Sequence, residues 1–327
     1  MMKLNINRFY DFLILSLFIV FMMSIPWVDV YESIYSVPYE DRSVYLKYFL
    51  FEESVLDYVV FSGVKDYFIH EFLWHYLIGH LLRLNFEIEF IFYFISFFSL
   101  LSAAFFILRF GKPWMLLLLI NPLLIDFYFS QLRSALAVSL LMYAYLAKDR
   151  FKIISLFLVF FAMMVHTASF LFVVFYLFLL FMNKIVLVFN LSKIYYFIAL
   201  LIFGAIVSLA LGPLREWILM LIGDRRAEYP DMQSSFLYST FWIIFLFWMI
   251  FNYKYLMDDV INMYVFIILS VVAFNTLHGG YSTRFLAAAF PLIVLSVFNF
   301  KGLWKISIVT LFFFYICVQW LFWLRFL

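Results

Sequence analysis

The stretch QLRSALAVSLLMYAYLAKDRFKIISLFLVFFAMMVHTASFLF, residues 131–172, contains two apolar runs joined by a short basic turn. Each run is close to the length that a helix needs to cross the hydrocarbon core of a bilayer. The turn, residues 148–152, carries two lysines and an arginine, and such residues accumulate in cytoplasmic loops. The stretch therefore predicts a membrane-embedded helical hairpin, with Arg133 and His166 at its outer end.

The composition of the whole chain agrees with this hairpin. The chain is 68% hydrophobic and only 13% charged, whereas soluble domains are about half apolar and a quarter charged. We therefore predict an all-α, polytopic membrane protein with a single membrane domain over residues 1–327 and about 11 (10–12) transmembrane helices. The spans are expected at 9–26, 86–108, 113–128, 134–148, 151–166, 168–183, 193–211, 237–252, 260–277, 286–300 and 306–324.

Three polar segments interrupt the apolar runs. Residues 27–70 and 212–236 are expected as loops on the outer side. Residues 70–84 contain an acid, two further histidines and an arginine after His70, which makes them a poor span. This segment is expected as an interfacial helix lying at, or dipping into, the outer surface.

Lysine and arginine are distributed differently in this topology. Most lysines fall in short clusters between alternate spans, and these clusters define the cytoplasmic side. Most arginines fall in the outer segments instead. The planar fork of arginine grips phosphate or carboxylate with two parallel hydrogen bonds. The outer arginines are therefore candidates for binding an anionic group: Arg42, Arg83, Arg133, Arg215, Arg225, Arg226, Arg284 and Arg325.

Arg133 and His166 each allow a structural and a functional interpretation. An arginine at the end of a span can anchor in the lipid headgroups, but Ser134, Ala135 and Ala137 follow Arg133. Small residues let helices pack closely, which favours Arg133 facing protein. His166 is either a structural residue whose hydrogen bonds are made within the protein, between two short spans, or a proton-transfer group. The second alternative arises because histidine titrates near neutrality.

Further polar residues are expected on the same side of the membrane. By default each would be a surface residue of a loop or turn. They come, however, from separate spans and loops, as a shared cavity requires, and polar groups at membrane depth favour a functional site. The complete set is Asp41, Glu71, Gln131, Arg133, His166, Arg225, Arg226 and Arg284.

These motifs resemble the EpsG-like family, relatives of the Wzy polysaccharide polymerases. The shared pattern in residues 131–172 is an arginine that opens a small-residue helix, a basic turn, and a span that ends in histidine. The segments PYEDRSVYLKYF and DYFIHEFLWHYLIGHLL resemble the first outer loop of family-C glycosyltransferases, although Glu71 lacks the proline often found after such an acid. YSTRFLAAAFPLIVLS resembles the late arginine motif.

The resemblance implies a polysaccharide (O-antigen or exopolysaccharide) polymerase with a family-C-like fold. It would join undecaprenyl-diphosphate-linked oligosaccharide units at the outer face of the bacterial inner membrane, with inversion and without metal or cofactor. Asp41, Glu71 and His166 would be catalytic, and Tyr281 would bind substrate. The diphosphate would bind to Arg133, Arg284, Arg225, Arg226 and Gln131.

The expected partners are the lipid-linked substrate, membrane lipid, a chain-length regulator and a Wzx-like flippase, and no nucleic acid. Other classes of protein stay open at this point. A glycan ligase or a polyprenyl-phosphate-dependent glycosyltransferase would use the same groups. A flippase for lipid-linked oligosaccharides would also place arginines in a membrane cavity, but it should show inverted repeats or matching broken helices.

Overall fold

The computed structural model describes residues 8–50, 61, 63–224, 227, 236–278 and 283–326. Every regular element in these ranges is a helix. The chain divides into two compact units. The first unit comprises Met1–Leu171 with Gln319–Leu327, and the second comprises Phe172–Val318.

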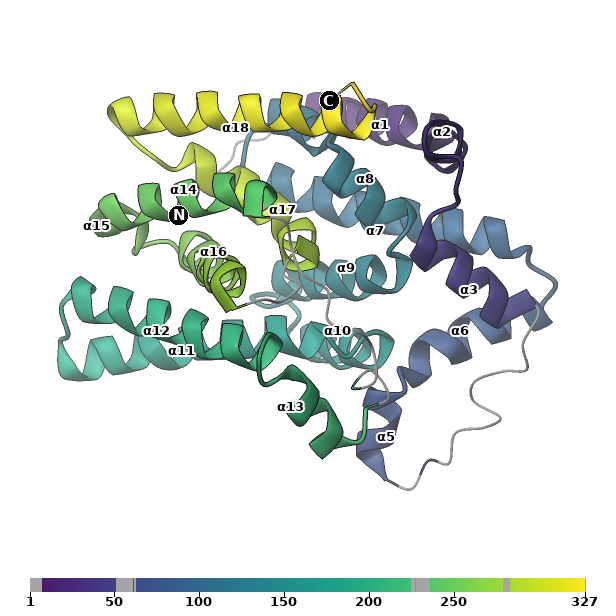
Figure 1. Ribbon diagram of the computed structural model, residues 1–327, viewed down its shortest axis with the longest axis horizontal. Coiled ribbons are helices and arrows are strands. Elements are labelled where there is room, and N and C mark those ends of the chain that lie inside the picture. Colours follow the sequence, from purple (N-terminus) through teal and green to yellow (C-terminus); the bar gives the residue numbers. More distant parts are fainter. Residues whose placement is uncertain are drawn as a thin grey trace. The chain divides into compact units, whose positions relative to one another are not determined.

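The first unit is built around α7, which packs on α9, while α9 packs on α10. The short helices α5 and α6 lie against α10 (Figure 1). The helices of this unit are α1 (Arg8–Ser24), α2 (Trp27–Tyr35), α3 (Glu40–Leu50), α5 (Val64–Ile69), α6 (Phe72–Arg83), α7 (Ile88–Phe110), the 3-10 helix η1 (Pro113–Leu119), α8 (Pro122–Phe129), α9 (Leu132–Ala147) and α10 (Lys152–Val165), with the end of α18.

The second unit is built around α16, which is largely buried and packs on α12, α14 and α17. Its helices are α11 (Ser169–Phe189), whose first residues belong to the first unit, α12 (Lys193–Leu211), α13 (Arg215–Ile222), α14 (Phe236–Phe251), α15 (Tyr253–Leu256), α16 (Val260–His278), α17 (Thr283–Phe298) and α18 (Gly302–Trp323).

Among the described helices, five are long and apolar enough to cross a membrane, or seven if each of two bent pairs is one span. Three shorter apolar helices accompany them: Lys152–Val165, Tyr238–Phe251 and Arg284–Phe298. The chain is therefore an all-helical, multi-pass integral membrane protein, as predicted. By length and composition the described helices support five to seven spans, fewer than the expected number of about 11.

The expected span 113–128 is wrong as a continuous helix. It contains η1 and α8, separated at Ile120 and Asn121. The Asn121 side chain caps α8 by accepting a hydrogen bond of 2.9 Å from the Leu123 N–H, and Pro122 follows at the first helical position. A proline disfavours helical backbone in the residue before it, so the apolar run breaks there. A second break separates α8 from α9, which are bent by 101°.

The segments expected as outer loops contain short helices. Residues 27–70 include α2, α3 and α5, and residues 212–236 include α13. The expected helix at 70–84 is present as α6, which buries Trp74, His75 and Ile78 and leaves Tyr76 and His80 exposed. Its amphipathic character fits a surface helix, and its depth in the membrane stays a prediction.

Helices α12 and α16 approach each other closely at Gly204. A Cβ atom at this position would lie 2.5 Å from the Cβ of Ser270. We expect Gly204→Ala to lower the free energy of unfolding by about 1–3 kcal/mol, because overpacking forces neighbouring atoms apart. The measurement is thermal unfolding of the purified protein in detergent.

Gly79 in α6 provides a matched control for this substitution. A Cβ atom at Gly79 would meet nothing within 4 Å, and alanine has the higher helix propensity. Gly79→Ala should therefore leave the unfolding temperature unchanged or raise it slightly. Equal unfolding temperatures for the two variants would contradict the close α12–α16 packing.

Candidate functional site

The helical hairpin of α9 and α10 places Arg133 and His166 at the same end. Arg133 lies in the first turn of α9, and His166 directly follows the last residue of α10. The two helices run in opposite directions and pack along their lengths. A third side chain, Glu71 from the turn between α5 and α6, meets both of them.

Glu71 uses both carboxylate oxygens in these contacts. Its Oε2 lies 2.5 Å from Arg133 Nη1, and its Oε1 lies 2.6 Å from His166 Nδ1. The backbone N–H of Thr167 donates a third contact, 3.1 Å to Oε1. Only 5% of Glu71 is exposed. We refer to Glu71, Arg133, His166 and Thr167 as the Glu71 cluster.

The backbone at Glu71 is in the left-handed region, with φ 52° and ψ 46°. This conformation costs a non-glycine residue about 1–2 kcal/mol. The surrounding structure holds it there. The Thr167 hydroxyl donates to the Phe68 carbonyl at 2.8 Å, which ties the turn after α10 to the last turn of α5. Backbone strain of this kind is frequent at functional sites, where it fixes the direction of a side chain.

Burial makes the charges of the Glu71 cluster mutually dependent. The Arg133 side chain is 19% exposed and that of Glu71 is 6% exposed. Two opposite charges withdrawn from water stabilise each other, and removal of one leaves the other with an uncompensated desolvation cost. Arg133 is therefore held by protein in this structure. A purely lipid-facing anchor would not need a buried acid from another helix.

Helix α3 supplies one wall of the cluster. The Tyr45 ring centroid lies 5.6 Å from Arg133 Cζ, within cation–π range, and the same ring meets Trp74 edge-on at 5.3 Å. Asp41 lies one helical turn before Tyr45 and is half-buried. Residues four apart share one face of a helix, so α3 presents Asp41 on the same face as Tyr45.

Arg42 fixes α3 in this position. It is buried, forms an ion pair with Glu89 of α7 and donates to the Phe129 carbonyl of α8 at 3.2 Å. Its guanidinium also lies 5.0 Å from the Phe92 ring. Sequence reasoning counted Arg42 only among the outer arginines and gave Tyr45, Thr167 and Glu89 no role. Only the tyrosine-rich segment around Tyr45 carried a usable signal.

The remaining candidate residues lie in other parts of the chain. Gln131 precedes α9, and its buried Oε1 accepts no hydrogen bond from the described residues. Arg284 is the second residue of α17 and belongs to the second unit. Arg225, Arg226 and Tyr281 lie outside the described residues.

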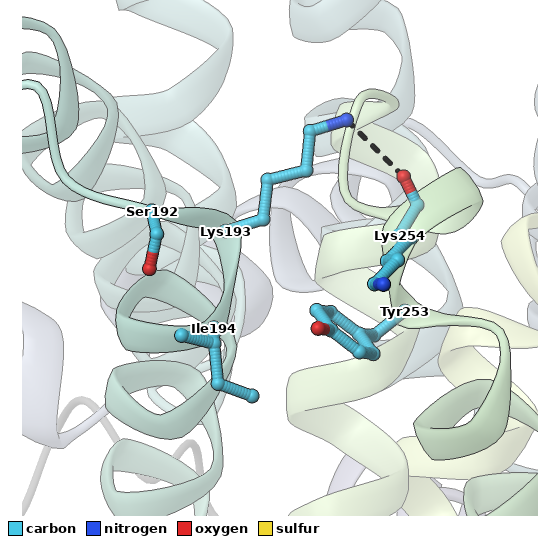
Figure 2. A pocket seen from close by; sticks show the side chains of 5 residues that line it. All are labelled: Ser192, Lys193, Ile194, Tyr253 and Lys254. Atoms are coloured by element: carbon cyan, nitrogen blue, oxygen red, sulfur yellow. Dashed lines mark hydrogen bonds between the residues drawn. The ribbon is translucent and has the colours of Figure 1, made fainter.

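The second unit contains a separate shallow pocket, lined by Ser192, Lys193, Ile194, Tyr253 and Lys254 (Figure 2). Figure 2 shows the Lys193 amino group directed to the Lys254 carbonyl, at 3.1 Å. Lys193 also pairs with Asp258 at 2.6 Å, and both side chains are largely exposed. Exposed ion pairs contribute little free energy. These contacts join two helix turns and give no reason to assign a reaction here.

The fold and the cluster together define a class of protein: a multi-pass helical membrane protein with a buried acid–arginine–histidine site at the end of a helical hairpin. The EpsG family model matches residues 9–327. The chain therefore belongs to the EpsG family. Searches of curated proteins and of solved structures found no match to this chain.

Proposed function

We propose that this protein is a glycan polymerase that joins undecaprenyl-diphosphate-linked oligosaccharide units at the outer face of the bacterial inner membrane. EpsG family membership supports a polysaccharide polymerase-like membrane protein. The observation that carries the proposal is the buried contact of one acid, Glu71, with both Arg133 and His166. In this arrangement Arg133 can stabilise a departing diphosphate, and His166 can accept a proton.

Arg133 is the group suited to the leaving diphosphate. When the anomeric carbon–oxygen bond breaks, negative charge develops on the diphosphate oxygens. A preorganised cation in a water-poor site stabilises such charge strongly. A guanidinium has five N–H donors, so the contact with Glu71 at Nη1 does not exhaust its capacity.

His166 is the group suited to the acceptor hydroxyl. With Nδ1 on Glu71, the proton of the attacking hydroxyl would pass to Nε2. The acceptor oxygen would then form its bond to the anomeric carbon as the bond to the diphosphate breaks, which inverts that carbon. Glu71 would orient the imidazole and stabilise the imidazolium, as the carboxylate does in other acid–histidine pairs. In this scheme Asp41 is a second candidate for orienting the acceptor.

The decisive experiment supplies the purified protein with synthetic undecaprenyl-diphosphate oligosaccharide. We expect longer chains to form without nucleotide sugars and in the presence of a chelator, since the proposed steps use only side chains. Gel separation of the products shows their lengths. Transfer of labelled lipid-linked units between the leaflets of a vesicle without any elongation would favour a flippase instead.

Replacement of His166 tests its place in the reaction. We expect His166→Ala to slow elongation by about 100-fold, within the range by which general-base catalysis accelerates reactions, while binding of the lipid-linked substrate largely survives. His80→Ala, at an exposed position of α6, is the matched control and should elongate normally. Normal elongation by His166→Ala would remove His166 from the mechanism.

A further inference from the structure

A second group of polar and aromatic side chains lies in the first unit, apart from the Glu71 cluster. It joins α2 and the residue Tyr39 after it to the C-terminal end of α18, and Figure 1 shows α2 beside that end. We call this group the aromatic wall. It consists of Trp27, Tyr31, Tyr35, Tyr39, Trp320 and Trp323.

Three tyrosines of the wall form one stack. The Tyr31 ring lies between Tyr39, at 3.8 Å and 18°, and Tyr35, at 4.5 Å and 20°. Arg325 covers Tyr35, with its Cζ 4.3 Å from the ring centroid. The stack leaves ring edges accessible, since Tyr31 and Tyr35 are half-buried and Arg325 is exposed. Stacked rings have little rotational freedom left to lose when a ligand binds.

A carboxylate lies against the stack. Asp126 Oδ1 accepts two hydrogen bonds, from the Tyr39 hydroxyl at 2.6 Å and from Trp323 Nε1 at 3.1 Å. Burial and the adjacent Asp126 carboxylate raise the pKa of Tyr39, so its hydroxyl stays protonated and remains a donor. The second oxygen, Oδ2, accepts no hydrogen bond from the part of the chain that the structure describes. Two donors therefore hold Asp126 in one orientation with an acceptor oxygen left over.

We propose that the aromatic wall and Asp126 form a binding subsite for pyranose units of the oligosaccharide that this protein handles. Sugar hydroxyls donate to a carboxylate oxygen and accept from arginine and tyrosine, the groups that Asp126, Arg325 and Tyr35 provide. The apolar C–H groups of a pyranose pack against the accessible edges of these rings, which combine a large apolar area with a polar end. The proposed function is used here only to identify the ligand as an oligosaccharide.

The position of the wall fits a glycan that also reaches the Glu71 cluster. The Asp126 carbonyl accepts from the N–H groups of Ser130 and Gln131, at 3.0 and 3.3 Å, just before Arg133. Tyr39 directly precedes α3, which carries Tyr45 beside Arg133. The rise along α3 from Glu40 to Tyr45 is about 8 Å, a length that a short run of sugar units covers.

The test uses free oligosaccharides, without lipid, cut from the glycan that the producing cells export. Calorimetric titration of the purified protein in detergent should show binding. Tyr35→Ala and Asp126→Asn should each weaken it about tenfold, the loss expected for one good hydrogen bond or ring contact. In elongation assays both variants should raise KM for the acceptor more than they lower kcat, and should yield shorter chains.

Tyr10→Ala, at an exposed position of α1, is the matched control and should bind as the wild type does. Tyr35→Phe removes only the hydroxyl and covers the case in which Tyr35→Ala does not fold. If folded variants bind oligosaccharide as tightly as the wild type, the wall is an interfacial aromatic anchor and the inference is wrong.

The outcomes for the subsite and for the polymerase are distinguishable. Wild-type protein that elongates lipid-linked substrate but binds no free oligosaccharide overturns the subsite alone. Wall-dependent binding without any elongation supports the subsite and argues against the polymerase.

Discussion

Arg133→Lys should lower elongation by about 100-fold or more, the effect of removing a preorganised donor from a developing negative charge. Lysine keeps the positive charge but loses the planar fork. Because Nη1 of Arg133 holds Glu71 at 2.5 Å, a lysine ammonium at this position cannot also present a second, coplanar donor to a diphosphate. Product ladders from the purified variant, at equal protein amounts, measure the effect.

Arg83→Lys is the control for this experiment. Arg83 lies at the exposed end of α6 and donates only to the Gly79 carbonyl, a turn earlier in the same helix, in the contacts that the structure describes. It should elongate at the wild-type rate. If Arg133→Lys gives the same product ladder as the wild type, Arg133 is a structural residue or a headgroup anchor, a role that lysine can also fill.

Glu71→Ala should have the largest effect on stability of any single substitution considered for this chain. Removal of one partner from a buried ion pair destabilises proteins by about 3–5 kcal/mol, and Glu71 also holds His166 and the Thr167 N–H. Elongation should be lost as well, because both Arg133 and His166 lose their orientation. Thermal unfolding in detergent and product ladders give the two readouts.

The backbone at Glu71 supplies a finer comparison. Glycine relieves the left-handed conformation at φ 52°, whereas alanine does not. Glu71→Gly should therefore unfold at a higher temperature than Glu71→Ala, with both inactive. In addition, Glu71→Leu combined with Arg133→Leu should recover much of the lost stability without activity, since an apolar pair often replaces a buried ion pair at little cost. A Glu71→Ala variant as stable and active as the wild type would show that the ion pair is dispensable.

The part of the site that the sequence predicted follows from local rules. The lengths of the apolar runs 134–148 and 151–166 predict two helices joined by a short turn. Arg133 and His166 were therefore expected at the same end of the hairpin, and the structure has this geometry. Glu71 was a candidate as one of several polar residues expected on the outer side of the membrane. Its contacts with both residues depend on a left-handed backbone and on packing between distant segments, and no spacing in the sequence encodes these.

Hydropathy could not detect the break at Asn121 and Pro122. Leucines on both sides of it give the same average as a continuous span, and only the capping contact and the proline mark the boundary. Asp126, Tyr39 and Trp323 escaped notice for a related reason. None of the three stands out from its neighbours in the sequence. The hydrogen bonds of Asp126 reach Tyr39, 87 residues away, and Trp323, 197 residues away.

The 101° bend between α8 and α9 also contributes to the electrostatics of the hairpin end. The bend starts a new helix at Leu132, and the Gln131 side chain does not cap it. The aligned peptide dipoles of α9 therefore place a partial positive charge, about half an elementary charge, in the turn that contains Arg133. Peptide dipoles do not titrate and cannot rotate away, so the contribution of α9 to the potential at this end is the same at every pH at which the protein is folded.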